Sequence, residues 1–386
     1  MHPSVVRQHH ASRIFHTIRL NPDLSQREIA DLAEVDKSTV STILKDFEDA
    51  GLIVRSQRKA GGGRGRPGDG ISIAGFGGLF IGIHPVPWEI HFVVAGLDGV
   101  PVGSITRPMP HHSELAAHLN KGIDELVASI GRSRADVRAV GISVLGLLTA
   151  DGYWAHSPNF GWRDIPLRKL LEEQIQLPLF IDNSANADAL AEHMFGAAIR
   201  SDNFIYVSSE SGVGSGIFLD GSLYRGSGGF AGEFGHTKVV PNGRLCRCGN
   251  EGCVSAYVSD FALLQRTREA GIEVKCIEEV AQAATEGDPQ VIEIVTDAGT
   301  KLGLGLSNMV NMFNPSLIVL GGGLLRFRTI LHPFVQRSLD EMSLPAVIEQ
   351  VTLQYSALSP SDTPRGGLAL ALEGCTIVIG NHNSLW

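Results

Sequence analysis

The fold of the N-terminal segment is decided by residues 25–54, which read SQREIADLAEVDKSTVSTILKDFEDAGLIV. Ser25 followed by Glu28 has the spacing of a capping box, in which each side chain accepts a hydrogen bond from the other residue's backbone N–H. This signal predicts a helix that begins after Ser25 and runs through Ala33. A turn at residues 34–36 follows, so the stretch predicts two helices in close succession.

A second helix is predicted over residues 37–50, with Asp36 as its N-cap. Its apolar residues recur at i, i+3, i+4 and i+7 and form one stripe, made of Val40, Ile43, Leu44 and Phe47. The opposite face is polar and contains Lys37, Ser38, Thr39, Ser41, Thr42 and Lys45. Short hydroxyls and lysines suit a major groove, where phosphate oxygens and base edges accept hydrogen bonds, so these six residues are predicted to bind DNA.

A β-hairpin is predicted after this helix. Gly51 stands where a helix C-cap is wanted, and strands are expected at residues 52–54 and 71–73. The tip between them is rich in glycine and carries Arg64 and Arg66, which can enter a minor groove. Such helix pairs also serve in protein contacts, and a Gly/Arg stretch also serves as a linker. The order of helix, turn, polar-faced helix and basic hairpin favours a winged helix-turn-helix that binds double-stranded DNA.

Charge is divided unevenly along the chain. The formal net charge is −9, yet residues 1–70 contain 11 Lys and Arg against 9 Asp and Glu, whereas the remainder contains 21 against 32. The N-terminal segment therefore suits a nucleic-acid partner although the whole chain is acidic. No apolar run reaches the roughly 20 residues that cross a bilayer, and the N-terminus lacks the apolar core of a signal peptide. We expect a cytoplasmic protein with no membrane partner.

From residue 76 onward, strand-like apolar runs alternate with helical patterns, which predicts an α/β architecture. Strands are expected at residues 79–83, 90–97, 137–144, 179–181, 203–207 and 317–320. Helices are expected at residues 113–130 and 165–176. Glycine-rich turns, which allow a backbone to approach a phosphate or sugar closely, are expected at residues 212–216 and 321–323.

One imidazole and three thiols lie close together in the sequence, at His236, Cys246, Cys248 and Cys253. This set completes a tetrahedral site, which is the composition of structural rather than catalytic zinc. In a reducing compartment, grouped cysteines favour a metal over a disulfide, and over unrelated buried residues. Arg244 and Arg247 flank the thiols and are expected to offset thiolate charge. Cys276 and Cys375 stand alone and are expected to be packed apolar residues.

Four motifs are specific in combination: SPNFGW at 157–162, LP at 177–178 followed by DNSAN at 182–186, the run from Gly212 to GEFGH at 232–236, and CRCGNEGC at 246–253. In these motifs the chain resembles the ROK family of repressors and sugar kinases over nearly its whole length. The resemblance implies a two-lobed, actin- and hexokinase-like α/β fold with a sugar cleft, preceded by a DNA-binding head. It implies a head at residues 1–75, a first lobe at 76–195 completed by a C-terminal helix at about 362–386, and a second lobe at 196–361 with the zinc site and a dimerisation surface.

The resemblance also implies a site for a sugar or sugar phosphate. Gly146, Asn159, Asn183, Glu233 and His236 match family positions that line the cleft. Glu233 is the expected anchor, because a carboxylate can accept hydrogen bonds from two hydroxyls. His236 is expected to bind zinc through one ring nitrogen while the other faces the sugar.

A ROK-type sugar kinase with an added head is the alternative. Kinases of the family carry a glycine-rich phosphate turn with an acid after the first strand, where this chain has HPVPW at 84–88. Two prolines and no acid cannot reproduce such a turn. The family's catalytic Asp follows an Asn, where this chain has Asn183 followed by Ser184, which is no base. We therefore expect no catalytic residues, and a repressor rather than an enzyme.

The expected cleft lacks a second acid as well, because Ser255 stands where the family usually has Glu. Losing two negative charges either weakens the binding of an ordinary hexose or makes room for a larger or anionic sugar. A cleft that serves only in dimerisation is a third possibility. Since one winged helix reads DNA weakly, we expect a homodimer or homotetramer whose affinity for its operator changes when the sugar binds.

Overall fold

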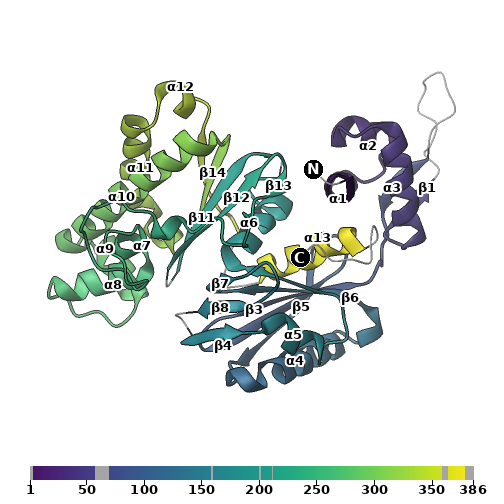
Figure 1. Ribbon diagram of the computed structural model, residues 1–386, viewed down its shortest axis with the longest axis horizontal. Coiled ribbons are helices and arrows are strands. Elements are labelled where there is room, and N and C mark those ends of the chain that lie inside the picture. Colours follow the sequence, from purple (N-terminus) through teal and green to yellow (C-terminus); the bar gives the residue numbers. More distant parts are fainter. Residues whose placement is uncertain are drawn as a thin grey trace. The chain divides into compact units, whose positions relative to one another are not determined.

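The computed structural model describes residues 3–56, 69–157, 160–199, 201–210, 212–358 and 364–378. Their contacts divide the chain into two compact units, the first made of residues 1–155, 162–187 and 363–386 and the second of residues 156–161 and 188–362. Figure 1 labels the helices and strands of both units. No helix of the described residues is long and apolar enough to cross a bilayer.

The predicted helix pair is confirmed in the N-terminal part of the first unit. Helix α2 spans Gln26–Ala33, and Ser25 and Glu28 form both bonds of the capping box. Helix α3 spans Lys37–Asp49, and Asp36 caps it by accepting from the backbone N–H groups of Ser38 and Thr39. The whole predicted apolar stripe of α3 is buried. A helix that was not predicted, α1 (Pro3–Leu20), packs against both α2 and α3.

The predicted hairpin is also present. Strand β1 (Ile53–Ser56) pairs antiparallel with β2 (Gly70–Ile73), with Ile53 opposite Ile73. Leu24 exchanges two backbone hydrogen bonds with Ile71 and so extends this small sheet on its other side. The predicted tip, with Arg64 and Arg66, lies outside the described residues.

The remainder of the first unit is built on a five-stranded sheet of order β10-β6-β3-β4-β5. The strands are β3 (Leu79–Pro85), β4 (Glu89–Ala95), β5 (Pro101–Pro108), β6 (Val137–Val144) and β10 (Leu179–Asn183). β3 is parallel to β6 and antiparallel to β4, and β10 is parallel to β6. Two short 3-10 helices, η1 (His112–Glu114) and η2 (Arg134–Asp136), flank helix α4 (Leu115–Ser129), which packs on β4 and β5.

The last helix of the chain, α13 (Arg365–Val378), packs on β3, β6 and β10 of this sheet. The approach is close enough to require glycine. A Cβ at Gly141 would lie 2.0 Å from the backbone oxygen of Gly367, and a Cβ at Gly82 would lie 2.4 Å from the backbone nitrogen of Leu368. Real Cβ atoms do not come so near to backbone atoms, so α13 and the sheet are fitted to one another.

The outer side of α13 carries Glu373, which contacts helix α1. Ser12 donates a hydrogen bond of 2.8 Å to Glu373 Oε2, and His16 Nε2 lies 3.2 Å from the same oxygen. His16 is buried, and burial lowers the pKa of its imidazole despite the opposing effect of Glu373. Two further hydrogen bonds join the same regions, from Arg19 to the carbonyl of Asp98 and from Arg138 to the carbonyl of Ala50. Side chains therefore hold the N-terminal helices against the last helix and the sheet.

The second unit has its own five-stranded sheet, of order β13-β12-β11-β14-β15. These strands are β11 (Phe204–Ser209), β12 (Val213–Leu219), β13 (Ser222–Leu223), β14 (Leu317–Gly322) and β15 (Thr352–Tyr355). β14 is parallel to both β11 and β15, whereas β12 is antiparallel to β11 and β13.

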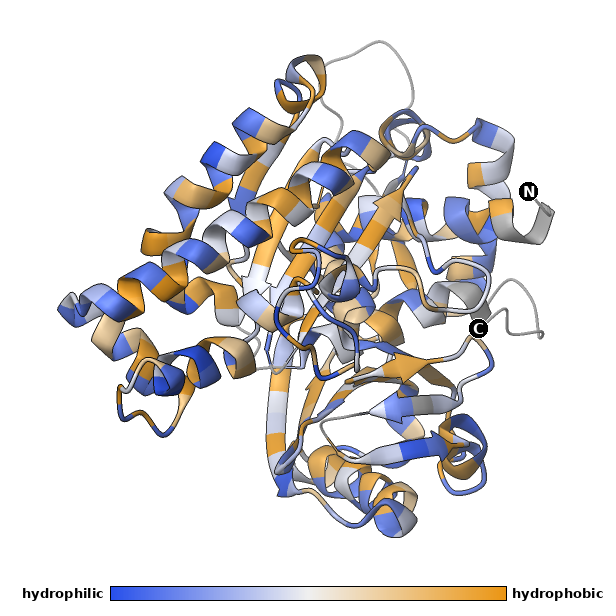
Figure 2. Cartoon of the chain, turned by 60° about the vertical axis from the view of Figure 1, so that its left-hand side comes forward, coloured by the Kyte–Doolittle hydropathy of each residue, from blue (hydrophilic) through white to orange (hydrophobic). Residues whose placement is uncertain are grey.

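Helices and one large core accompany this second sheet. The helices are α7 (Ser255–Val258), α8 (Asp260–Glu269), α9 (Ile277–Glu286), α10 (Pro289–Phe313), α11 (Arg328–Met342) and α12 (Pro345–Ile348), with the 3-10 turns η3 (Phe234–His236) and η4 (Gly323–Phe327). Apolar residues of β11, β12 and β14 pack with those of α10 and α11 in one core. Figure 2 shows strands that are mostly orange and helices that alternate orange with blue, as expected when one face of a helix is buried.

Three elements lie at or beside the boundary between the units. Helix α6 (Ser184–Phe195) begins in the first unit and ends in the second. A three-stranded sheet of order β7-β8-β9 contains β7 (Leu147–Leu148), β8 (Trp154–Ser157) and β9 (Trp162–Ile165), and helix α5 (Leu167–Glu172) follows it. The predicted domain limits at residues 75, 195 and 361 stay predictions.

Several predictions are wrong in detail. The glycine-rich segment at 212–216 is not a turn, because Val213 to Gly216 lie within strand β12. The helix predicted at 165–176 is only six residues long. Cys276 is exposed rather than packed, since it stands just before α9. The predicted strands at 79–83, 90–97, 137–144, 179–181, 203–207 and 317–320 are all present, as is the helix at 113–130.

Replacement of Glu373 by Ala is expected to loosen α1. The substitution removes the carboxylate that Ser12 and His16 contact. Two buried or half-buried polar groups then lack this partner, which lowers the free energy of unfolding by about 1–3 kcal/mol. Hydrogen exchange should then be faster for the amides of α1 than in the unchanged protein. The matched control is Glu341→Ala, which breaks an exposed i,i+4 pair with Arg337 and should have little effect. Equal exchange in α1 for both variants would contradict the assigned contact.

Candidate metal centre, ligand site and DNA-binding surface

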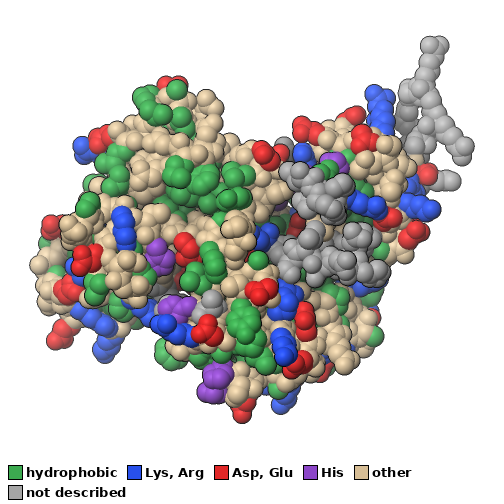
Figure 3. Space-filling model, viewed as in Figure 1, with side chains coloured by type: hydrophobic (Ala, Val, Ile, Leu, Met, Phe, Trp, Pro, Cys, Tyr) green, Lys and Arg blue, Asp and Glu red, His purple; other side chains and the backbone are tan. Residues whose placement is uncertain are grey.

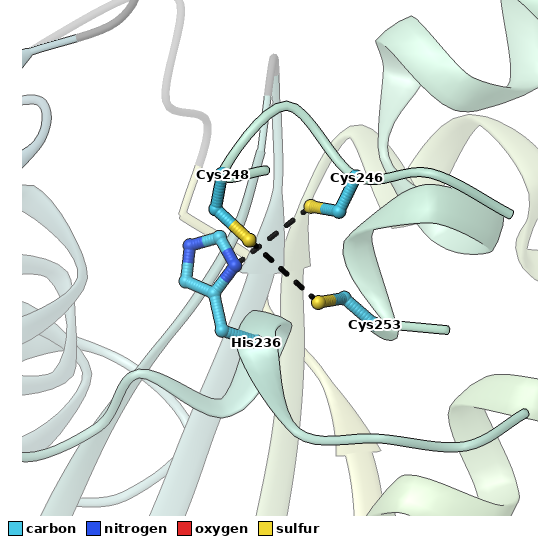
Figure 4. Close-up of side chains that lie close together, drawn as sticks. All are labelled: His236, Cys246, Cys248 and Cys253. Carbon is cyan, nitrogen blue, oxygen red and sulfur yellow. Dashed lines mark hydrogen bonds between the residues drawn. The ribbon is translucent and has the colours of Figure 1, made fainter. Parts of the chain in front are cut away.

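The four predicted metal ligands come together in the second unit. The ligand atoms of His236, Cys246, Cys248 and Cys253 all lie within 4.8 Å of one another. His236 Nδ1 is 3.8 Å from Cys246 Sγ, and the sulfur atoms of Cys248 and Cys253 are also 3.8 Å apart. Figure 4 shows the imidazole ring and the three sulfur atoms pointing toward one another. The cluster could hold one metal ion.

The loop that carries the cysteines is folded by its glycines. Gly249 and Gly252 have φ angles of +88° and +74°, which residues with a side chain rarely adopt. A Cβ at Gly252 would lie 1.8 Å from the backbone oxygen of Val240, so this position requires glycine. Cys246 donates its backbone N–H to the carbonyl of Asn250 over 2.7 Å, which closes the turn that carries Cys248. The spacing of the cysteines in the sequence thus follows from the path of a tight loop.

A lysine that the sequence did not single out contacts the thiols. Lys238 Nζ lies 3.0 Å from Cys253 Sγ, and this contact raises the pKa of Lys238. Arg244, which was expected to offset thiolate charge, forms an ion pair with Glu269 instead. The guanidinium of Arg247 lies 4.9 Å from the centre of the Phe261 ring. In the sequence, this contact was indicated by the position of Lys238 two residues after the predicted ligand His236.

Glu233 lies on the other side of the His236 ring. Its Oε2 is 3.9 Å from His236 Nε2, whereas Nδ1 of the same ring faces Cys246. Both side chains are about 40% exposed, with values of 42% for His236 and 40% for Glu233. Burial nevertheless raises the pKa of the Glu233 carboxyl and lowers that of the His236 imidazole. One ring therefore stands between the thiols and an accessible carboxyl group that can accept hydrogen bonds from hydroxyls.

The segment that carries Glu233 and His236 lies directly on strand β12. A Cβ at Gly232 would be 2.2 Å from the carbonyl oxygen of Ser215, and one at Gly235 would be 2.1 Å from that of Val213. Ser215 also donates its hydroxyl to the carbonyl of Gly232 over 2.9 Å. The two glycines thus fix the height of Glu233 and His236 above the sheet.

Two more of the predicted ligand residues meet in the first unit. Asn183, at the end of β10, donates from Nδ2 to the carbonyl of Gly146 over 2.6 Å, and its Oδ1 accepts from the backbone of Ala185 over 2.8 Å. Gly146 has a φ angle of +109°, which suits a turn after β6. Asn183 therefore holds this loop in place, and one N–H and one lone pair of its amide are left over. Asn159 lies outside the described residues.

The segment that replaces the kinase phosphate turn is an ordinary hairpin. His84 and Pro85 end β3, residues 86–88 join it to β4, and Val86 donates its backbone N–H to the carbonyl of Glu89. The His84 ring contacts the hydroxyl and the carbonyl of Ser143 at 2.9 and 3.1 Å. Ser184 is the first residue of α6, and Ser255 accepts from the backbone N–H of Val213.

The predicted DNA-binding face of α3 is exposed, apart from the half-buried Thr39. Ser38 donates its hydroxyl to Asp36, and Thr42 donates to the carbonyl of Ser38, so both keep only acceptor positions. Lys37, Ser41 and Lys45 remain as exposed side chains that can donate to phosphates.

Many other cations of the head are already paired. Arg7 pairs with Asp46, Arg13 with Glu34, and Arg55 with Glu48. Figure 3 accordingly shows blue and red side chains mixed over the visible part of the head rather than one basic surface. Among the described residues of the head, Lys37 and Lys45 are therefore the cations on the same helix face as the hydroxyls of α3.

Comparison with known proteins shows which protein families this chain matches. The sequence model of the ROK family matches residues 89–373, and that of the MarR family matches residues 8–65. The first match covers well over half of the chain, so the chain belongs to the ROK family. The second covers most of α1, the helix pair α2 and α3, and strand β1. The predicted fold, a ROK hexokinase-like fold behind a winged helix-turn-helix, is confirmed.

Two proteins that align with nearly the whole chain are described as regulators. The chain is 31% identical to the xylose repressor of Bacillus subtilis (strain 168), over 92% of each chain. It superimposes with a TM-score of 0.81 on a ROK family transcriptional regulator described as a homologue of Escherichia coli Mlc, at 26% identity and over 97% and 98% of the two chains. A ROK glucokinase from Streptomyces griseus, solved with glucose and AMPPNP, matches 76% of this chain with a TM-score of 0.64 and 28% identity. This chain is a DNA-binding transcriptional regulator of the ROK family and not one of its enzymes.

Replacement of Cys248 by Ser is expected to remove the metal ion. Cys248 is the exposed thiol of the cluster, whereas Cys246 and Cys253 are buried, so its replacement disturbs packing least. Elemental analysis of purified protein should find about one metal ion per chain in the unchanged protein and much less in the variant. Cys276→Ser, at an exposed thiol outside the cluster, is the control and should keep the ion. A Cys248→Ser protein with full metal content would show that this ligand set is wrong.

Proposed function

We propose that this chain is a repressor whose affinity for its operator is set by a sugar or sugar derivative. The observation that carries the proposal is the combination of a MarR-type head with a ROK body in one chain that aligns with a xylose repressor over 92% of both lengths. In this proposal, residues 1–75 are the DNA-binding head. Residues 76–195 with 362–386 form the first lobe, and residues 196–361 form the second.

The head would place α3 in the major groove. Lys37, Ser41 and Lys45 would donate to phosphates or bases, and Ser38, Thr39 and Thr42 would add shorter contacts. Arg64 and Arg66 of the hairpin tip would reach the neighbouring minor groove. A symmetric operator needs two heads, so we propose a homodimer, or a homotetramer formed from two dimers, with its interface in the second lobe.

The effector would be held by the residues that match the family's ligand positions, which are Glu233, His236, Asn183, Gly146 and Asn159. Glu233 supplies an acceptor for two hydroxyls, and the amide of Asn183 supplies one further donor and acceptor. Ser184 stands where the family's catalytic Asp follows the Asn, and residues 84–88 lack the glycines and the acid of the phosphate turn, so binding would not lead to phosphoryl transfer.

The metal ion is proposed to be structural zinc. Bonds of about 2.3 Å to a tetrahedral ion place sulfur atoms roughly 3.8 Å apart. The observed separation of Cys248 and Cys253 Sγ is 3.8 Å, so the ligand set fits the ion. Zinc on Nδ1 would leave the proton on Nε2, which faces Glu233, and would fix the ring relative to the sugar.

The chain path suggests how the ligand reaches the head. The chain passes between the units near residues 155–162, 187–188 and 362–363, and α13 begins just after the last of these passages. Asn183 directly precedes the helix that crosses at 187–188. A change of orientation between the lobes would therefore act on α13, whose Glu373 contacts α1 of the head.

Replacement of Lys45 by Ala is expected to weaken operator binding and its dependence on salt. Removing one lysine–phosphate ion pair lowers the slope of log affinity against log salt by about 0.9. Binding to the operator, located by selection on the protein's own genome, should be measured at several salt concentrations. Lys121→Ala, at an exposed lysine of α4 that pairs with Glu125, is the matched control and should bind as the unchanged protein does. Identical slopes for all three proteins would show that Lys45 does not contact a DNA phosphate.

Replacement of Glu233 by Gln is expected to abolish the response to the sugar while leaving DNA binding intact. In the unchanged protein, titration of the operator complex with xylose, glucose and their phosphates should identify one compound that shifts affinity by about 5- to 150-fold. The variant should need a much higher concentration of that compound, because the amide replaces one acceptor oxygen by a donor and its remaining oxygen, being neutral, accepts more weakly than a carboxylate. Glu251→Gln, at an exposed residue of the metal loop, is the control. If the variant responds as well as the control does, the sugar does not bind at Glu233.

A further inference from the structure

A cavity of about 510 Å³ lies at the outer edge of the second unit's sheet, away from the residues discussed above. It is formed between the first turns of α11 and the edge strand β15. Its lining consists of Arg328, Thr329, His332, Leu353, Gln354 and Tyr355. The volume falls in the range of small-molecule sites and is far larger than an inorganic ion needs.

The charge of this cavity is positive and uncompensated. None of its lining residues is acidic, and the first turn of α11 has no acidic side chain. Arg326, two residues earlier, pairs with Asp260 and Glu278, and Arg337, further along α11, pairs with Glu341. Within the described part of the chain, Arg328 has no such carboxylate partner and lies instead over the Tyr355 ring, 4.5 Å from its centre. An aromatic face thus holds the guanidinium at the cavity while its N–H groups stay available.

The other lining groups add donors around Arg328. Tyr355 Oη lies 3.4 Å from His332 Nδ1, and the two rings meet at an angle of 60° with centres 5.8 Å apart. These contacts orient the phenol and the imidazole, and Thr329 and Gln354 add a hydroxyl and an amide. The dipole of α11, a helix of 15 residues that begins at Arg328, also favours an anion at this end. Leu353 and the Tyr355 ring provide apolar surface on the strand side.

We propose that this cavity binds a phosphate monoester of a small organic molecule. Arg328 would hold the phosphate in a two-pronged contact, with Thr329 and His332 donating to its remaining oxygens. Leu353 and the Tyr355 ring would cover the carbon skeleton, and Gln354 would bond to its polar groups. The site contains none of the proposed sugar ligands, so a phosphorylated metabolite would act as a second effector beside the sugar.

The test uses glucose 6-phosphate, with glucose and inorganic phosphate as comparison ligands, and full-length protein in isothermal titration calorimetry. Unchanged protein should bind glucose 6-phosphate more tightly than either comparison ligand. Arg328→Gln should weaken that binding about tenfold or more, because a neutral amide replaces the charged donor of the phosphate. Arg337→Gln, at an exposed arginine of the same helix, should leave it unchanged. Arg328 is exposed, so its replacement should not alter the melting temperature.

Two outcomes overturn the proposal. The first is unchanged protein that binds neither glucose 6-phosphate nor inorganic phosphate. The second is binding that Arg328→Gln leaves intact, in particular binding that Glu233→Gln abolishes, which would place the phosphorylated sugar at Glu233. Failure of this site would not affect the proposed repressor function, since operator binding and the Glu233 site use other residues.

Discussion

The first unit depends on the close approach of the last helix to the sheet. Backbone of α13 lies against backbone of β3 and β6, and three glycines, Gly82, Gly141 and Gly367, make this possible. Any side chain there would push the helix outward and open the core beneath it. The chain must therefore return from the second unit to complete the first, and this return brings Glu373 to the N-terminal helix.

That return also brings the body of the first unit into direct contact with the N-terminal helices. Ser12 and His16 contact Glu373 directly, and Arg138 and Arg19 add hydrogen bonds to backbone carbonyls on either side of this contact. Because His16 is buried and burial lowers its pKa, the contact relies on a neutral imidazole rather than an exposed ion pair that salt would screen. The N-terminal helices are thus joined to the rest of the first unit by short-range contacts of α13 and of the sheet.

The sequence predicted those parts whose signals are local. The capping box at Ser25, the Asp36 cap and the apolar stripe of α3 specify the helix pair before any tertiary contact forms. Helix α1 was missed because its apolar residues show little periodicity, and its burial depends on α3 and α13, which are distant in sequence. The segment at 212–216 was misread because glycines that normally mark turns here belong to β12, where the carbonyls of Val213 and Ser215 contact Gly235 and Gly232. Whether a glycine serves a turn or a close contact depends on what packs above it.

The cluster of His236 and three cysteines was predicted from residue types, whereas its relation to the candidate ligand site at Glu233 needed the structure. His236 belongs to both, because Nδ1 faces the thiols and Nε2 faces Glu233. Gly232 and Gly235 fix the turn that carries both side chains on β12, and Gly252 closes the cysteine loop. The position of the ring beside Glu233 therefore depends on the same loop and turn that bring the three thiols together. His236 is therefore the residue through which the four-residue cluster and the Glu233 carboxyl are connected.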